Sequence, residues 1–250
     1  MRDFFVEHVL PPYLSAPAID GVFFDGFNTG YQGPSFAPWG RVATNVPNCT
    51  AAGGAGCAAL RDGAIDLAER VTRALNRAGK VPMFSNVGSF QRPPSVAPAF
   101  WLDEERLLAA LDGLDYLLNY EGVRAEAMHS SGDLANMLEE ARRDVPVGVH
   151  TYLRSAKEDL SAHVAVFLLF RRDYWFYFAS TGWLDKDWAY HPIFDTAAKC
   201  GKPLGLPTGA PPPLAYRRAY EHCAVSINCT TAKDGCHAAI TWALPAAALA

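Results

Sequence analysis

Polar side chains that could do chemistry follow short apolar runs at five places along this chain. Two of them are carboxylates: Asp25 follows the run at 22–24, and Glu121 follows the run at 117–120. A pair of carboxyl groups, one charged and one protonated, can cleave a glycosidic bond that lies between them. The residues that follow or end these runs are Asp25, Asn86, Glu121, His150 and Ser180.

The apolar runs alternate with stretches of helical periodicity, and this alternation predicts how the polar residues are positioned. Residues 57–79 and 130–144 have the spacing of amphipathic helices, and Gly79 is a typical helix C-cap. Continuous apolar strands between helices predict a parallel sheet that is covered on both faces. An α/β fold of this kind is either an open doubly wound sheet or a (β/α)8 barrel.

Two observations favour the barrel. A dinucleotide-binding sheet would carry GxGxxG after its first strand, whereas the glycines at 53–56 lie between Cys49 and Cys57, far from a strand end. Functional residues of a barrel gather at the C-terminal ends of several strands, which is where the five polar residues are predicted to lie. We therefore expect a TIM-barrel-type α/β fold.

The chain shows fewer strand–helix units than a closed barrel contains. After residue 182 the helical periodicity stops, and alternating segments near the end of the chain predict an antiparallel hairpin. We interpret residues 1–182 as the C-terminal part of a barrel, visible as strands 4–8. Residues 183–215 are an aromatic, Pro- and Gly-rich connection, and 216–250 begin a small β-rich domain. The first three strands are then missing, so we expect the chain to be incomplete.

At these residues the chain resembles the glycosyl-hydrolase-like (β/α)8 barrels. The segment VFFDGFN is similar to their fourth strand, and WAYHPIFDTAAKCGKPLGLPTG with YRRAYEHCAVSIN is similar to the segment that ends their barrel. The resemblance covers residues 15–230 and departs from the family in lacking the first three strands. In α-galactosidase-like and α-glucosidase-like barrels the nucleophile ends strand 4 and the acid/base ends strand 6, which implies Asp25 and Glu121.

The surroundings of the two carboxylates fit this assignment. Glu121 ends an apolar run, and partial desolvation of a carboxyl group suits a general acid. Asp25 suits the charged partner, with the Asn28 amide as a hydrogen-bond donor. The two roles can be exchanged. Two simpler interpretations stay open, because Asp25 could cap a turn and Glu121 could be a solvated loop acid.

Substrate-binding side chains are expected around this pair. Asn86 and His150 can hydrogen-bond to sugar hydroxyls, and Trp183 and Trp188 can stack on sugar rings. The alternatives are a histidine without a chemical role and tryptophans that pack the C-terminal segment against the barrel. We predict a secreted glycoside hydrolase that acts on an oligo- or polysaccharide without metal or cofactor. The alternative is a catalytically silent carbohydrate-binding or structural barrel.

Composition and cysteine content bear on the compartment and the partners. The net charge is −4 and no basic stripe is present, so we expect no nucleic-acid partner. No apolar run approaches the length of about 20 residues that a membrane span needs. Cysteines close to one another and N-x-T sequons at Asn48 and Asn228 favour an extracellular compartment, although no signal peptide is visible. Free buried thiols are the alternative. The pairs expected to form disulfides are Cys49–Cys57 and Cys229–Cys236.

Overall fold

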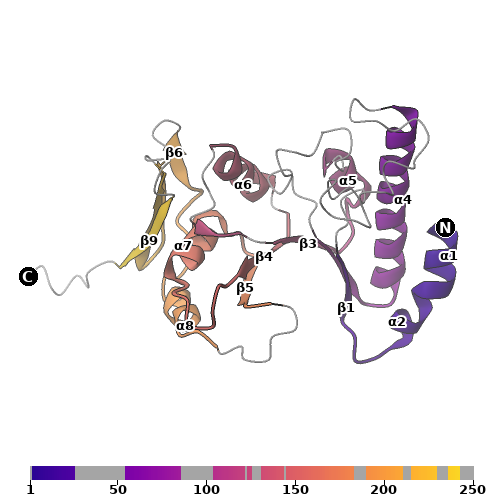
Figure 1. Cartoon of the computed structure of the whole chain (residues 1–250), viewed down its shortest axis with the longest axis horizontal. Coiled ribbons are helices and arrows are strands. Elements are labelled where there is room, and N and C mark those ends of the chain that lie inside the picture. The colour runs from indigo at the N-terminus through magenta and orange to yellow at the C-terminus, as the bar shows by residue number, and fades with distance from the viewer. Residues whose placement is uncertain are drawn as a thin grey trace, which may run out of the picture. The chain divides into compact units, whose positions relative to one another are not determined.

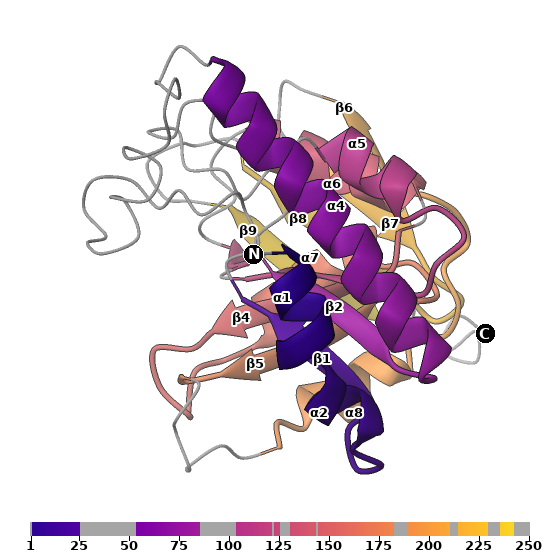
Figure 2. The same cartoon turned by 90° about the vertical axis from the view of Figure 1, so that its right-hand side faces the viewer.

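The computed structural model describes most of the chain, and the chain divides into two compact units. The first unit is Met1–Tyr120 and the second is Glu121–Ala250. Figures 1 and 2 together label the α-helices and strands of both units. The described residues are 2–25, 54–85, 104–121, 123–125, 131–143, 145–182, 190–210, 215–229 and 236–242.

Parallel strands form the sheet of the first unit. β1 (Gly21–Phe24) pairs with β2 (Val81–Ser85), and β2 pairs with β3 (Leu117–Tyr120), so neighbours in sequence are neighbours in the sheet. Parallel neighbours need a crossover between them. The two crossovers contain α4 (Ala55–Arg77) and α5 (Glu104–Ala110). Helix α4 runs beside this sheet in both views (Figures 1 and 2), where it packs against β2.

An apolar core holds the helices and the sheet of the first unit together. Phe24 of β1 stacks on Phe84 of β2 with ring centroids 5.3 Å apart, and Phe5 approaches Phe24 at 6.2 Å. Most of the buried residues of α4 recur at helical spacing, so one face of the helix is turned to the core. They are Cys57, Ile65, Ala68, Val71, Thr72 and Leu75. The short elements before β1 are α1 (Arg2–Phe4), the π-helical turn η1 (Phe5–Val9) and α2 (Pro11–Ser15).

Helix α4 ends where the sequence predicts. Gly79 has a φ of +69°, a left-handed conformation that favours glycine just after a helix. The N–H of Lys80 then donates to the Leu75 carbonyl at 2.9 Å. The Lys80 ammonium donates to the carbonyls of Ala16 (2.8 Å) and Ile19. It therefore ties the segment before β1 to the segment before β2.

The second unit begins with another parallel pair of strands. β4 (Val147–Tyr152) and β5 (Phe176–Ser180) run side by side, with His150 opposite Phe178. Helix α6 (Ser131–Arg143) precedes β4, and α7 (Ser161–Phe170) lies in the crossover from β4 to β5. Helix α7 begins at Ser161, where the Asp159 carboxylate accepts hydrogen bonds from the Ser161 N–H (2.9 Å) and hydroxyl (2.7 Å).

Helix α7 carries apolar residues on all sides, and both β5 and the antiparallel sheet pack against it. Phe167 meets Tyr177 of β5 with ring centroids 5.4 Å apart, and Phe170 meets Tyr216 of the antiparallel sheet at 6.4 Å. The helix also packs against β8 and β9 of that sheet. An all-round apolar helix is expected in such a buried position. No helix among the described residues is both long enough and apolar enough to cross a membrane.

The antiparallel sheet near the C-terminus has the order β6-β7-β8-β9. The predicted hairpin is confirmed, because β7 pairs with β8 and β8 pairs with β9 in antiparallel register. The predicted Cys229–Cys236 disulfide is also present and closes the turn between β8 and β9, with Cα atoms 4.2 Å apart. The strands are β6 (Thr208–Ala210), β7 (Ala215–Ala219), β8 (Cys223–Asn228) and β9 (His237–Trp242).

A further disulfide was not predicted from the sequence. Cys200–Cys223 joins the chain after α8 (Ile193–Ala198) to the start of β8, with Cα atoms 5.0 Å apart. Cys57 is disulfide-bonded as well, and its predicted partner Cys49 lies outside the described residues. None of the cysteines in the described ranges is a free thiol.

The coarse prediction of the fold is confirmed. The protein is a mixed α/β structure in which parallel strands alternate with helices and a separate antiparallel sheet follows. Closure of the parallel strands into an eight-stranded barrel stays a prediction, as does the division of the chain at 182 and 215.

Candidate functional site

A group of polar and aromatic side chains gathers near the C-terminal ends of β4 and β5. We call Glu121, His150, Tyr152, Phe178 and Ser180 the strand-end cluster. His150 lies opposite Phe178, and Tyr152 lies opposite Ser180. Because alternate residues of a strand point to the same face, these four share one face of the strand pair. The other face carries Tyr177, which packs on Phe167 of α7.

Short contacts connect the members of the strand-end cluster. The Tyr152 hydroxyl donates to Glu121 Oε2 at 2.9 Å. His150 Nε2 and Ser180 Oγ are also 2.9 Å apart. The His150 ring stacks on Phe178 with centroids 4.4 Å apart and meets the Tyr152 ring edge-on at 4.4 Å. The carboxylate, the imidazole and the serine hydroxyl therefore belong to one connected group of side chains.

His150 is neutral in the folded protein. Its side chain is completely buried, and burial lowers its pKa from 6.5 to about 4 because the charged imidazolium loses its solvation. A neutral imidazole carries one donor and one acceptor nitrogen. His150 can then either give a proton to Ser180 or accept one from it.

The segment that carries Glu121 is fastened to β4 by further hydrogen bonds. The Val123 N–H donates to the His150 carbonyl at 3.1 Å. The Thr151 hydroxyl returns a bond to the Val123 carbonyl at 2.6 Å. These contacts place the chain after β3 alongside the end of β4. They account for the approach of Glu121 to Tyr152, which stands 31 residues further along the chain.

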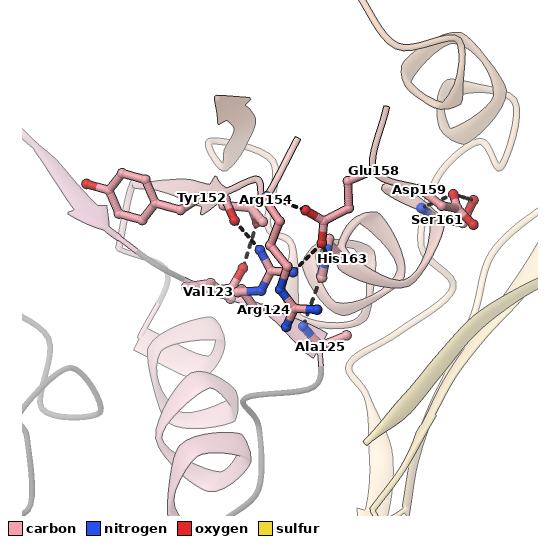
Figure 3. Close-up of polar contacts among 10 residues, drawn as sticks. Val123, Arg124, Ala125, Tyr152, Arg154, Glu158, Asp159, Ser161 and His163 are labelled. Atoms are coloured by element: carbon pink, nitrogen blue, oxygen red, sulfur yellow. Dashed lines mark hydrogen bonds and ion pairs between the residues drawn. The ribbon is translucent and has the colours of Figure 1, made fainter. Parts of the chain in front are cut away.

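A second polar group lies beside this segment and is drawn in Figure 3. We call Arg124, Arg154, Glu158 and His163 the arginine network. The Arg124 guanidinium donates to the Tyr152 carbonyl and to Glu158, and the Arg154 N–H donates to the same carboxylate. Arg124 thereby holds the backbone of Tyr152 through its carbonyl oxygen.

The tautomer of His163 follows from its contacts. The Ala125 N–H donates to His163 Nδ1 at 3.1 Å, so the ring proton sits on Nε2. That nitrogen faces Glu158 Oε1 at 3.5 Å. Burial raises the pKa of Glu158, but hydrogen bonds from Arg154 and Arg124 and the charge of Arg124 outweigh it. The pKa of Glu158 is therefore lowered, and the carboxylate is charged near neutral pH.

The structure places three of the predicted site residues. Asp25 directly follows β1 in the first unit and is exposed. Glu121 and His150 lie in the strand-end cluster of the second unit and are connected through Tyr152. The predicted residues outside the described ranges are Asn28, Asn86, Trp183 and Trp188.

The sequence analysis did not predict two groups of polar residues that the structure brings together. Tyr152 is one: strand alternation from His150 would have placed it on the same face, next to the strand end. The pair Ser85 and Asn119 is the other. They stand opposite each other at the ends of β2 and β3, are fully buried, and are joined by an Asn119 Nδ2 to Ser85 Oγ bond of 3.4 Å. A buried amide in an apolar strand is the signal that could have found them.

Comparison with protein-family models and with curated proteins finds no match to this chain. Among the described residues, no three His, Cys, Asp or Glu side chains are grouped as metal ligands would be. The strand-end cluster itself offers a carboxylate with hydroxyl and imidazole neighbours.

Proposed function

We propose that this protein is a secreted glycoside hydrolase that cleaves O-glycosidic bonds of an oligo- or polysaccharide. The observation that carries the proposal is the Glu121 carboxylate, which is oriented by the Tyr152 hydroxyl near the C-terminal end of parallel strands. Catalytic residues of barrel enzymes occupy such strand ends. Asp25, which follows β1, is the proposed second carboxyl group.

In this proposal the two carboxyl groups divide the chemistry. Glu121 protonates the leaving oxygen and then activates water, while Asp25 attacks the anomeric carbon as a charged nucleophile. The roles can be exchanged. A separation of about 5–5.5 Å would imply retention of configuration, and about 6.5–9.5 Å would imply inversion. We favour retention, because the resemblance places the pair as in retaining barrels.

The face that carries the strand-end cluster also suits a sugar. Phe176, which is 39% exposed, lies on this face beside Phe178, with ring centroids 5.9 Å apart. Gly148 stands opposite Phe176, and a Cβ there would come within 2.7 Å of its ring. Glycine at 148 therefore leaves room for the Phe176 ring. Aromatic rings can stack on the C–H face of a sugar, while the Ser180 hydroxyl, which contacts His150, can hydrogen-bond to the hydroxyls of that sugar.

The same features favour a second candidate function. Aromatic rings with neutral imidazole and hydroxyl groups can bind a glycan without cleaving it. A catalytically silent carbohydrate-binding barrel would need Phe176 and His150 but not the charge of Glu121. The disulfides Cys200–Cys223 and Cys229–Cys236 support an extracellular location for either function, because disulfides persist in oxidising compartments.

The test compares Glu121→Gln and Asp25→Asn with the parent on a panel of aryl glycosides and polysaccharides. General acid/base catalysis contributes about 10²–10⁴-fold, so each change should remove most of the turnover. Asp112→Asn, which alters an exposed carboxylate in the turn after α5, is the matched control and should leave the rate unchanged. Parental rates in both site variants would refute the assignment. Glycan binding without cleavage by the parent would support the silent barrel instead.

A further inference from the structure

A basic cavity lies in the second unit, away from the strand-end cluster. Its volume is about 600 Å³. Its walls come from the link between α7 and β5, from the segment before β6, and from β7. The lining includes four cations and one carboxylate, although the whole chain has a net charge of −4. The charged residues of this basic cavity are Arg171, Arg172, Asp173, Lys202 and Arg218.

Arg218 is a fixed, buried charge in the wall of the basic cavity. Its side chain donates to the Gly205 carbonyl at 2.8 Å and to the carbonyls of Leu168 (3.2 Å) and Leu169 (3.3 Å) at the end of α7. It also donates to the Arg171 carbonyl at 2.5 Å. Carbonyls satisfy its N–H groups but carry no full negative charge, so they leave a positive potential beside the cavity.

The segment that carries Lys202 is held in place before any ligand arrives. The Cys200–Cys223 disulfide fixes one end of it. The Lys202 N–H donates to Glu221 Oε2 at 2.8 Å, and the Glu221 N–H donates to the Lys202 carbonyl at 3.1 Å. These contacts use the main chain of Lys202 and do not involve its ammonium group. The ammonium is therefore presented from a rigid backbone, and this lowers the cost of ordering it on binding.

We propose that the basic cavity binds an oxyanion, such as inorganic sulfate or a sulfate group of an acidic glycan. Arg171 and Lys202 are the donors, since guanidinium and ammonium groups are the usual partners of oxyanions. Arg218 supplies background charge. This inference does not depend on the proposed function. Arg171 and Asp173 lie before β5 and Ser180 ends it, and the strand alone puts about 13 Å between its two ends at 3.3 Å per residue.

The test measures binding of sodium sulfate, and of a sulfated oligosaccharide against its desulfated form, by calorimetry on the full chain. Arg171→Glu and Lys202→Glu are the site variants. Both are expected to fold, because the contacts of these residues with the rest of the unit are made by the main chain. Arg217→Glu is the matched control. Arg217 is exposed on β7, next to Arg218, and does not line the cavity.

Each site variant should weaken binding about tenfold or more, because it both removes a cation and adds a repulsive charge. The control should bind the anion as the parent does. Rising salt should weaken anion binding by the parent and by the control. Binding of sulfate alone would identify a small-anion site, and binding of the sulfated oligosaccharide alone would identify a glycan site. Binding of neither, or equal losses in Arg217→Glu and the site variants, would overturn the proposal.

Discussion

The arginine network and the strand-end cluster both lie at the end of β4, and each contains a carboxylate with a different set of hydrogen-bond donors. In the arginine network, Glu158 receives the Arg124 guanidinium and the Arg154 N–H, and its pKa is lowered. In the strand-end cluster, Glu121 receives the neutral Tyr152 hydroxyl and neighbours a histidine that burial keeps neutral. The network pairs Glu158 with a cation, and the cluster orients Glu121 with a tyrosine hydroxyl.

The difference indicates what each region does. A carboxylate that is matched by a cation and a main-chain donor is typical of a structural support. It joins the segment after β3 to the loop after β4 and fixes the backbone of Tyr152. A carboxylate that a tyrosine hydroxyl orients beside a buried imidazole at a strand end is typical of a site that meets substrate. The arginine network should therefore govern stability, and the strand-end cluster should govern function.

The largest expected effect on stability comes from Arg124→Met. The Arg124 and Glu158 side chains are 13% and 16% exposed, so the change leaves a mostly buried carboxylate without its cation. We expect a loss of about 2–4 kcal/mol in the free energy of unfolding, measured with urea. Arg73→Met is the control, because its pair with Glu69 is solvent-exposed and should contribute at most about 1 kcal/mol. Equal losses in the two variants would remove the distinction.

A smaller effect per pH unit is expected from acidification through His150. Its pKa is about 4 in the folded state and 6.5 in the unfolded chain. Between these values the unfolded chain binds the extra proton, so stability is complete above pH 6.5 and is lost as the pH falls towards 4. The slope should be about 1.4 kcal/mol per pH unit at most. Urea unfolding across this range should show a shallower slope in His150→Gln. An unchanged slope would mean that His150 does not titrate in this way.

The smallest effect on stability is expected from Tyr152→Phe. The change removes the hydroxyl that orients Glu121 and keeps the ring against His150. Loss of one such hydrogen bond should cost about 0.5–1.5 kcal/mol. Tyr190→Phe removes an exposed hydroxyl that donates to Asp195, and it should leave the melting temperature nearly unchanged. If Tyr152→Phe is as stable as Tyr190→Phe, the hydrogen bond from the Tyr152 hydroxyl to Glu121 does not stabilise the fold.

The sequence predicted the parts of this fold that depend on local pattern. The periodicity of α4 and its Gly79 terminus, the apolar strands, and the Cys229–Cys236 pair across a short turn all involve neighbouring residues. Cys200–Cys223 was missed because 23 residues separate the two cysteines. They meet only after the chain following α8 packs against the hairpin of β7 and β8.

The candidate site shows the same limit. His150 lies two residues before the end of β4 and diagonally across from Ser180, and their contact at 2.9 Å follows from the parallel register that pairs Tyr152 with Ser180. Tyr152 and Arg124 were not foreseen. Their roles depend on how the segment after β3 folds back onto β4, through the Val123 N–H and carbonyl. Periodicity gives the face of a strand, but it does not predict which loop will cross that strand's end.

The central claim is that Glu121 serves function while Glu158 serves structure. The most direct measurement determines turnover and the free energy of unfolding for Glu121→Gln and Glu158→Gln side by side, on a sugar substrate of the parent. We predict a loss of turnover of about 10²–10⁴-fold with near-parental stability for Glu121→Gln. For Glu158→Gln we predict a clear loss of stability with near-parental turnover below its unfolding transition. The reverse pattern, or full activity in Glu121→Gln, would contradict the account.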